Sequence, residues 1–168
     1  KALYRKYRPC KLAEVVGQEQ VTKVLENSLK QGKVSHAYLF IGPRGTGKTS
    51  VARIFAHEVN GFKYELEDDY VDIVEIDGAS NRGIDNIREL REKAAIAPTS
   101  GKYKIYIIDE AHALSNQAWQ AFLKCIEEPP EYAVILLLTT NVESMLQTIL
   151  SRCVVLNIKP VGNDLIKN

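Results

Sequence analysis

The chain has 168 residues, with 22 lysines and arginines against 21 aspartates and glutamates, so its net charge of +1 excludes a strong overall attraction to nucleic acid or membrane. An apolar share of 45% and a charged share of 26% are ordinary for a globular protein, and the length favours one domain. The three cysteines, Cys10, Cys125 and Cys153, are widely spaced, which favours a reducing compartment over a disulfide or metal framework. Because the apolar runs are short and no secretory signal opens the chain, we expect a cytoplasmic protein without membrane contact.

The first part of the chain predicts a helix, a strand and a second helix. The apolar spacing of residues 21–29 predicts a helix that stops at Gly32. The apolar run 38–41 predicts a strand, which leads into a glycine-rich turn. The helix that follows reaches about Val59, where Asn60-Gly61 breaks it.

The remainder alternates strands with helices after an acidic connector at residues 61–70. Each predicted strand is an almost continuous apolar run, which indicates a parallel sheet covered by helices on both faces. The predicted strands are 71–76, 103–108, 133–139 and 154–158, and the predicted helices run through 84–94, from a Ser115 cap to Pro129, and around 144–150.

The stretch Gly42-Pro43-Arg44-Gly45-Thr46-Gly47-Lys48-Thr49 lies between the first strand and its helix. It fits the phosphate-loop pattern G-x-x-x-x-G-K-[ST] in the required strand–loop–helix context. Its glycines let the backbone wrap closely, so that amide N–H groups and the positive helix end face phosphates. Lys48 would reach the β- and γ-phosphates, and the Thr49 hydroxyl would ligate Mg²⁺. We expect a bound nucleoside triphosphate rather than an ordinary strand–turn–helix elbow.

Two carboxylates, Asp109 and Glu110, end the strand predicted at 103–108. Ligands of such sheets lie beyond the carboxyl ends of the strands, so these acids should face the phosphates. Asp109 would hold Mg²⁺, and Glu110 would polarise the attacking water, unless the acids only cap the next helix. Asp109-Glu110-Ala111-His112 also spells a helicase signature, but that requires a second domain for which this chain is too short.

Three further polar features are ambiguous from the residues alone. In Leu138-Thr139-Thr140-Asn141, a hydroxyl or amide could contact the γ-phosphate or the attacking water, or could cap a turn. Asp77 could likewise face the nucleotide or serve a turn. We expect the histidines, His36, His57 and His112, to be packed or at the surface rather than ligands.

Seven segments in order carry a family resemblance. The chain closely resembles the first domain of the gamma/tau subunits of bacterial DNA polymerase III, the ATPases of the sliding-clamp loader. The segments are Tyr4-Arg5-Lys6-Tyr7-Arg8-Pro9, Val15-Val16-Gly17-Gln18, His36-Ala37-Tyr38-Leu39-Phe40, the phosphate loop, Asp109-Glu110-Ala111-His112, Glu127-Glu128-Pro129-Pro130 and Ser151-Arg152-Cys153.

The resemblance implies an α/β P-loop NTPase of the AAA+ type, with a five-stranded parallel sheet in the order 5-1-4-3-2. It implies that Thr140 is the sensor residue after strand four and that Arg152 completes a neighbouring subunit's active site in trans. The catalytic set is then Lys48, Asp109, Glu110, Thr140 and Arg152. The nucleotide-binding set, whose first four members would line the adenine pocket, is Tyr7, Arg8, Val16, Gly17, Gly42, Gly45, Thr46, Gly47, Lys48, Thr49 and Ser50, with Thr49 and Asp109 on Mg²⁺.

The chain departs from the family's pattern in two ways. Gamma/tau subunits commonly carry a four-cysteine zinc module after the phosphate-loop helix, and only residues 61–70 fill that gap here, so we expect no zinc. The family continues into a helical lid and an oligomerising collar, so residues 1–168 resemble an isolated AAA+ nucleotide-binding domain.

By this resemblance the chain would bind and hydrolyse ATP with Mg²⁺ and drive loading of the sliding clamp onto primed DNA. Its expected partners are delta, delta prime and further gamma/tau subunits, the clamp, and primer-template DNA through the assembled complex. The alternatives are a small subunit of a replication factor C-type loader, a non-hydrolysing nucleotide-binding scaffold and a small-molecule kinase.

Overall fold

The computed structural model describes residues 10–62, 64, 71–80, 97–99, 101–145 and 147–160. The predicted helix through 84–94 and the aromatic arm up to Pro9 lie outside these residues. Within the described part of the chain, no helix is long and apolar enough to cross a bilayer.

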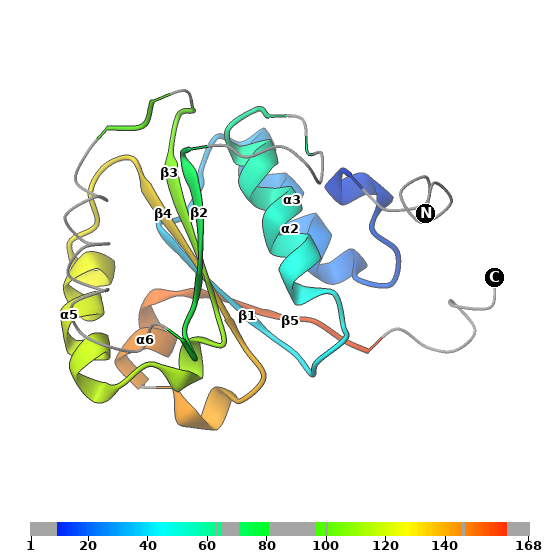
Figure 1. The fold of residues 1–168 in the computed structure, drawn as a ribbon. Coiled ribbons are helices and arrows are strands. Elements are labelled where there is room, and N and C mark those ends of the chain that lie inside the picture. Colours follow the sequence, from blue (N-terminus) through cyan, green and yellow to red (C-terminus); the bar gives the residue numbers. More distant parts are fainter. Residues whose placement is uncertain are drawn as a thin grey trace.

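Five parallel strands form one sheet in the order β2-β3-β4-β1-β5, which confirms the predicted topology. Every connection between neighbouring parallel strands must cross a face of the sheet, so the chain places helices between successive strands. Figure 1 shows the twisted sheet running through the middle of the domain. The strands are β1 (Ala37–Ile41), β2 (Ile73–Asp77), β3 (Lys104–Asp109), β4 (Ala133–Thr139) and β5 (Val154–Asn157).

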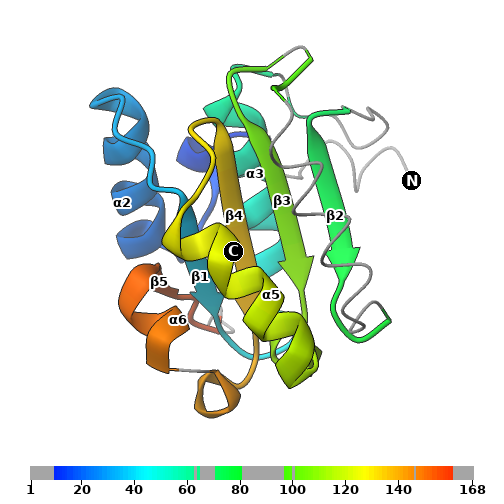
Figure 2. The ribbon, with the colours of Figure 1, turned by 90° about the vertical axis from the view of Figure 1, so that its left-hand side faces the viewer.

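Helices cover both faces of the sheet, as expected. α2 (Glu19–Lys30) and α3 (Lys48–Val59) lie on one face, and α5 (Asn116–Glu127) and α6 (Gln147–Arg152) lie on the other (Figures 1 and 2). Short 3₁₀ turns complete the described elements: η1 (Leu12–Glu14), η2 (Ala111–Ala113) and η3 (Val142–Ser144).

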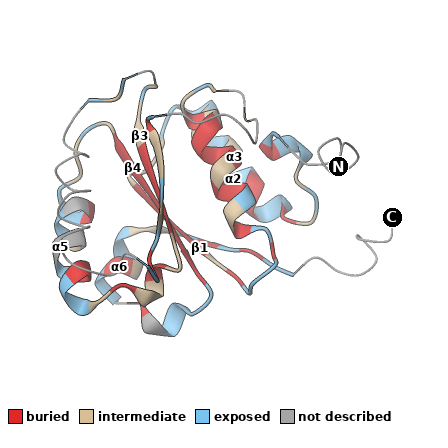
Figure 3. Cartoon of the chain, in the orientation of Figure 1, coloured by how far each residue is buried: buried red, intermediate tan, exposed pale blue. Residues whose placement is uncertain are grey.

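The two faces of the sheet have separate cores. In β4, Ile135 and Leu137 pack on the α5 side, whereas Leu136 and Leu138 pack on the α3 side. Every residue of β4 is therefore buried, as the red central strands in Figure 3 show. This two-sided burial explains why the strands read as continuous apolar runs rather than as alternating ones.

Two predicted elements differ clearly from the structure. β2 begins at Ile73 rather than at residue 71. The preceding Asp72 is fully buried, and its carboxylate accepts backbone N–H groups of Thr99 and Gly101 at 2.8 Å each. The helix predicted around 144–150 is instead η3 followed by α6. The Asn141 side chain accepts the N–H of Glu143 at 3.1 Å and starts a separate short turn.

Gly78 fixes how the end of β2 sits against the end of β3. Its N–H donates to the Asp109 carbonyl at 2.7 Å. A Cβ atom at Gly78 would lie 2.6 Å from the Glu110 carbonyl oxygen and 2.9 Å from that of Asp109. These are backbone atoms, which cannot move aside cheaply, so only glycine permits this approach.

We expect Gly78→Ala to lower the free energy of unfolding by about 1–3 kcal/mol, since it forces the β2 and β3 ends apart. Urea denaturation measures this loss. Gly32→Ala is the matched control, because Gly32 has a φ of +65° but a Cβ added there would meet no atom within 4 Å, which leaves a backbone cost of about 1 kcal/mol. A Gly78→Ala protein as stable as the wild type would contradict this account.

Candidate functional site

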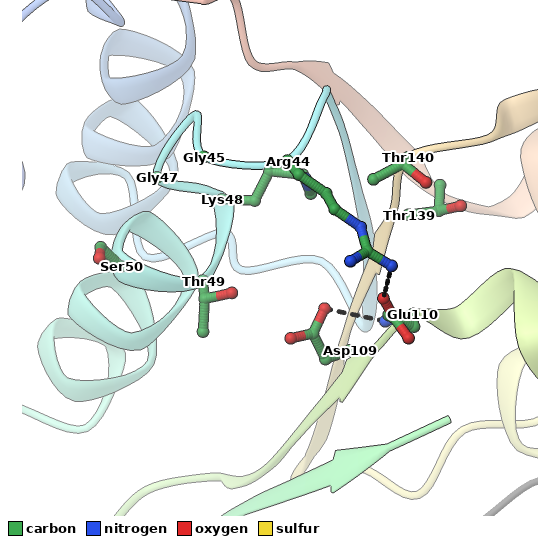
Figure 4. A pocket seen from close by; sticks show the side chains of 10 residues that line it. All are labelled: Arg44, Gly45, Gly47, Lys48, Thr49, Ser50, Asp109, Glu110, Thr139 and Thr140. Carbon is green, nitrogen blue, oxygen red and sulfur yellow. Dashed lines mark hydrogen bonds and ion pairs between the residues drawn. The ribbon is translucent and has the colours of Figure 1, made fainter. Parts of the chain in front are cut away.

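A cavity of about 270 Å³ lies at the carboxyl edge of the sheet (Figure 4). It is lined from three directions: by the loop after β1 with the start of α3, by the end of β3, and by the end of β4. Its lining residues are Arg44, Gly45, Gly47, Lys48, Thr49, Ser50, Asp109, Glu110, Thr139 and Thr140.

The phosphate-loop pattern folds here as a wrapped loop that enters α3. Gly45 and Gly47 have φ of 76° and 86°, in the left-handed region that favours glycine, and Gly47 is the residue before the helix starts. The N-terminus of α3 therefore opens on the cavity, with its unpaired backbone N–H groups and positive dipole end. Thr49 and Ser50 in the first turn bring hydroxyl groups to the same cavity.

Lys48 is buried, and its Nζ donates to the carbonyl oxygens of Gly42 at 2.6 Å and Pro43 at 2.9 Å. Burial of the ammonium lowers the pKa of Lys48 below its ordinary value, and the neighbouring Asp109 carboxylate partly opposes this shift. Burial therefore opposes the charged form here, whereas an anion placed beside Nζ would favour it. Such a lysine suits phosphate binding.

The two carboxylates predicted after β3 both line the cavity. An Asp109 carboxylate oxygen accepts the N–H of Glu110 at 2.8 Å. Glu110 has φ 48° and ψ 48°, a left-handed conformation that side chains rarely adopt, and it starts η2. Arg44 reaches toward it from the phosphate loop, and Nη2 of Arg44 lies 2.9 Å from the Glu110 carboxylate (Figure 4).

The two threonines that end β4 have different surroundings. Thr139 is buried, and its hydroxyl contacts Nδ1 of His112 at 2.8 Å and accepts the N–H of Asn141 at 3.0 Å. Thr140 is exposed at the cavity. Thr139 therefore fastens the turn, as the turn interpretation required, while Thr140 lines the cavity.

Several predicted site residues lie elsewhere. Tyr7 and Arg8 are outside the described residues. Gly42 and Thr46 are not among the lining residues of the cavity and instead make contacts that shape the loop: the Gly42 N–H donates to the Thr139 carbonyl at 3.2 Å, and the Thr46 hydroxyl donates to the Pro43 carbonyl at 2.6 Å. Contact of Gly42 and Thr46 with a nucleotide remains a prediction.

Gly17 lines a second cavity of about 190 Å³, whereas Val16 is 61% exposed. Gln18 closes one side of this second cavity by exchanging hydrogen bonds with the backbone of Lys159, at 2.6 and 3.1 Å. The segment before α2 is thereby joined to the chain after β5. The lining residues are Gly17, Gln18, Glu19, Gln20, Val21, Asn157 and Lys159.

Asp77 and the histidines make turn and packing contacts, and Arg152 lies at the surface. Asp77 accepts the N–H of Ala79 at 2.9 Å, which is the turn role. Ring nitrogens of His36, His57 and His112 all contact protein oxygens, as expected for packed histidines. Arg152 ends α6 with a side chain 41% exposed, 3.6 Å from the Glu127 carboxylate.

The phosphate-loop pattern assigns no role to Arg44, because this residue occupies a variable position of the pattern. The one feature of the sequence that could have indicated a role for Arg44 was its charge, in a loop that would face the acids after β3.

Among the described residues, no group of three or more histidine, cysteine, aspartate or glutamate side chains could hold a metal ion. Because most of residues 61–70 lie outside that part, the expected lack of zinc remains a prediction.

We expect Thr139→Val to lower the free energy of unfolding by about 1–3 kcal/mol, because it leaves His112 and Asn141 without their buried partner. Thr140→Val should change it by less than about 0.5 kcal/mol, since Thr140 is exposed. Urea denaturation of the two variants provides the comparison. Equal losses would show that Thr139 is not the fastening residue.

Comparison with known proteins agrees with this geometry. A family model described as DNA polymerase III, delta subunit, matches residues 17–162. The DNA polymerase III subunit tau of Bacillus subtilis is 49% identical over 166 residues, which cover 90% of this chain and 30% of that protein. The chain thus spans under a third of the length of this curated relative.

Solved structures show the same fold. A DNA polymerase III gamma subunit-related protein from Thermotoga maritima matches with a TM-score of 0.70 and 30% identity, over 85% of this chain and 48% of that one. The Thermotoga maritima RuvB Holliday junction branch migration motor, an AAA+ protein, matches with a TM-score of 0.65 and 25% identity, over 91% of this chain and 48% of that one. Because the family model covers most of its length, the chain belongs to the DNA polymerase III clamp-loader subunit family, whose gamma/tau members it resembles, and it has the AAA+ fold.

Proposed function

We propose that this chain is the ATP-binding and ATP-hydrolysing motor domain of a DNA polymerase III clamp loader, which drives loading of the sliding clamp onto primed DNA. The observation that carries the proposal is the convergence of two cations, Lys48 and Arg44, and two carboxylates on a single cavity at a helix N-terminus. The phosphate loop with Lys48 and the adjacent acids Asp109 and Glu110 come from separate parts of the chain, yet they line the same cavity.

The residues present fit a nucleoside triphosphate with Mg²⁺. The loop and the first turn of α3 offer backbone donors and hydroxyls to phosphate oxygens, and Lys48 supplies a cation. Thr49 and Asp109 supply the oxygen ligands that Mg²⁺ prefers. When bound, Mg²⁺ would neutralise charge that develops on the β- and γ-phosphate oxygens.

In the proposed mechanism, Lys48 exchanges its contacts with Gly42 and Pro43 for the β- and γ-phosphates. Glu110 accepts a hydrogen bond from water, orients it toward the γ-phosphorus and takes its proton. Thr140 donates to the γ-phosphate or to that water. Because all three sit on the ends of rigid elements, they hold the reacting groups in line at little entropic cost.

The adenine would bind near the second cavity, together with Tyr7 and Arg8. Support comes from the way in which Gln18 joins the segment before α2 to the chain after β5. An adenine base held there would contact both segments. The contribution of the base to the affinity for ATP would then depend on residues 17–21 and 157–159 rather than on the phosphate loop.

Arg152 is proposed to act in trans, on ATP bound by a neighbouring subunit. Its side chain is 41% exposed at the end of α6, where the guanidinium lies 3.2 Å from the Thr148 carbonyl and 3.6 Å from the Glu127 carboxylate. Both contacts are exposed to solvent and contribute little energy, so little holds the guanidinium in its own subunit. The proposed neighbours are delta, delta prime and further gamma/tau subunits. The assembled complex would bind the clamp and primer-template DNA in the cytoplasm.

The intact set of Lys48, Thr49, Asp109 and Glu110 around one cavity favours hydrolysis over a scaffold that only binds nucleotide. A small-molecule kinase would need a second substrate pocket beside the γ-phosphate. The charged lining of the first cavity suits water and phosphate oxygens better than an organic acceptor.

The experiment that tests nucleotide binding is Lys48→Ala in the full-length protein. We expect the affinity for Mg-ATP to fall at least a hundredfold, since the variant removes the buried cation that faces the β- and γ-phosphates. Isothermal titration calorimetry measures the affinity. Lys124 is an exposed residue of α5, so Lys124→Ala is the control and should bind ATP as the wild type does. Equal affinities for wild type and Lys48→Ala would refute the proposal.

Arg152→Ala tests the action in trans. In the assembled complex we expect it to leave ATP binding to its own subunit unchanged and to slow hydrolysis at the neighbouring site by about 10³-fold or more. Mixed complexes decide the question, in which Arg152→Ala is carried only by subunits already disabled by Lys48→Ala. Full-rate turnover at the neighbouring wild-type sites would mean that Arg152 is an ordinary surface charge.

A further inference from the structure

An ion pair connects the phosphate loop directly to the proposed catalytic glutamate. Nη2 of Arg44 donates to Oε1 of Glu110 at 2.9 Å, although the two residues lie far apart in the chain. Figure 4 shows the Arg44 side chain extending from the loop across the cavity to Glu110, past Thr140 and opposite Asp109. Arg44 and Glu110 both line the cavity, so the pair lies where the reaction would occur.

The backbone of Glu110 is fixed by its neighbours. Its N–H donates to the Asp109 carboxylate at 2.8 Å, and its carbonyl oxygen lies against Gly78, where a Cβ would come within 2.6 Å. Its left-handed conformation, with φ 48°, is thus imposed by the surrounding structure. These contacts set where the side chain of Glu110 begins but leave its carboxylate free to rotate.

Within the described part of the chain, the polar contact that the structure gives the Glu110 carboxylate is the one with Arg44. A glutamate that activates water must present one oxygen to that water in a fixed direction. Arg44 is suited to hold the other oxygen, because its guanidinium is planar, always charged and strong as a donor to carboxylates.

The pair contributes little to folding stability. The Arg44 side chain is 84% exposed and that of Glu110 is 31% exposed, so solvent screens their attraction. Its effect must therefore be sought in the orientation of the carboxylate rather than in the stability of the domain.

We propose that Arg44 is a positioning residue for hydrolysis, which orients the Glu110 carboxylate from the phosphate loop. The inference rests on the proposed ATPase function and adds to it a residue outside the fixed positions of the loop pattern. Because Arg44 belongs to the loop that would hold the phosphates, it ties the orientation of Glu110 to the segment that carries the substrate.

A different role for Arg44, direct contact with the γ-phosphate, gives opposite expectations. A positioning residue acts only through Glu110, so removing it should matter only while Glu110 can act as a base. An arginine on the phosphate would strengthen ATP binding relative to ADP, and its loss would slow hydrolysis whatever stands at position 110.

The test is a double-mutant cycle in the full-length protein assembled with its partner subunits. The variants are Arg44→Ala, Glu110→Gln and the two combined. We expect Arg44→Ala to lower kcat about ten- to a hundredfold, the scale of a misplaced catalytic group, while the dissociation constants of ATP and ADP stay within about twofold of wild type. In the Glu110→Gln background, Arg44→Ala should cause no further loss.

Two controls sharpen the cycle. Arg44→Lys keeps a cation that can reach Glu110 and should recover part of kcat. Arg53→Ala removes an arginine that pairs with Glu75 through two 2.8 Å hydrogen bonds outside the cavity, and it should leave both hydrolysis and binding unchanged.

The possible results separate the two levels of the hypothesis. An active wild type whose Arg44→Ala variant has full kcat would overturn this inference alone. Equal losses in the wild-type and Glu110→Gln backgrounds, or weakened binding of ATP but not ADP, would also overturn it in favour of phosphate contact. A wild-type protein that neither binds nor hydrolyses ATP would overturn the proposed function and this inference together.

Discussion

The parallel register of the sheet is the constraint on which the candidate site depends. Ile41 pairs with Thr139, and Asp77 pairs with Asp109, so the ends of neighbouring strands reach one edge together. The N–H of Gly42 donates to the Thr139 carbonyl at 3.2 Å, which carries the pairing one step past β1. The acids and threonines of the first cavity end or follow a strand fixed in this way, and Lys48 begins the helix that the loop after β1 enters. A slip in register would separate Lys48 from the acids without changing any of these residues.

The polar groups around this edge fall into two groups: those that hold the turn after β4 together and those that remain accessible in the cavity. The Thr139 hydroxyl and the Asn141 side-chain oxygen accept hydrogen bonds within the turn, whereas Thr140 and the start of α3 line the cavity. Lys48 shares features of both groups, because its ammonium is buried and its hydrogen-bond partners among the described residues are the loop carbonyls of Gly42 and Pro43. Carbonyl oxygens are weaker partners for a cation than phosphate oxygens, which gives an incoming anion a reason to displace them.

The sequence was sufficient for the sheet order, through family resemblance, and for the phosphate loop, through its pattern. It was sufficient for the strands because burial on both faces leaves an unmistakable apolar run, as in β4. It could not separate Thr139 from Thr140, since their roles depend on which one meets His112 across the fold. Nor could it find the Arg44–Glu110 pair, because a variable loop position carries no pattern and the contact is long-range. The contacts of the buried Asp72 carboxylate were hidden for a similar reason, because its partners are the backbone amides of residues 99 and 101.

The place of β2 at the sheet edge has a consequence for local unfolding. Among the described strands, β2 pairs with β3 alone and its residues are half-buried or exposed, whereas β1 and β4 are central and largely buried. Edge segments open at lower free energy than the core, so amide protons of β2 should exchange with solvent sooner than those of β1 and β4. Gly78, at the end of this strand, supports the peptide between Asp109 and Glu110. A transient opening of the edge would therefore loosen the two acids while the phosphate loop, anchored between central strands, stays folded.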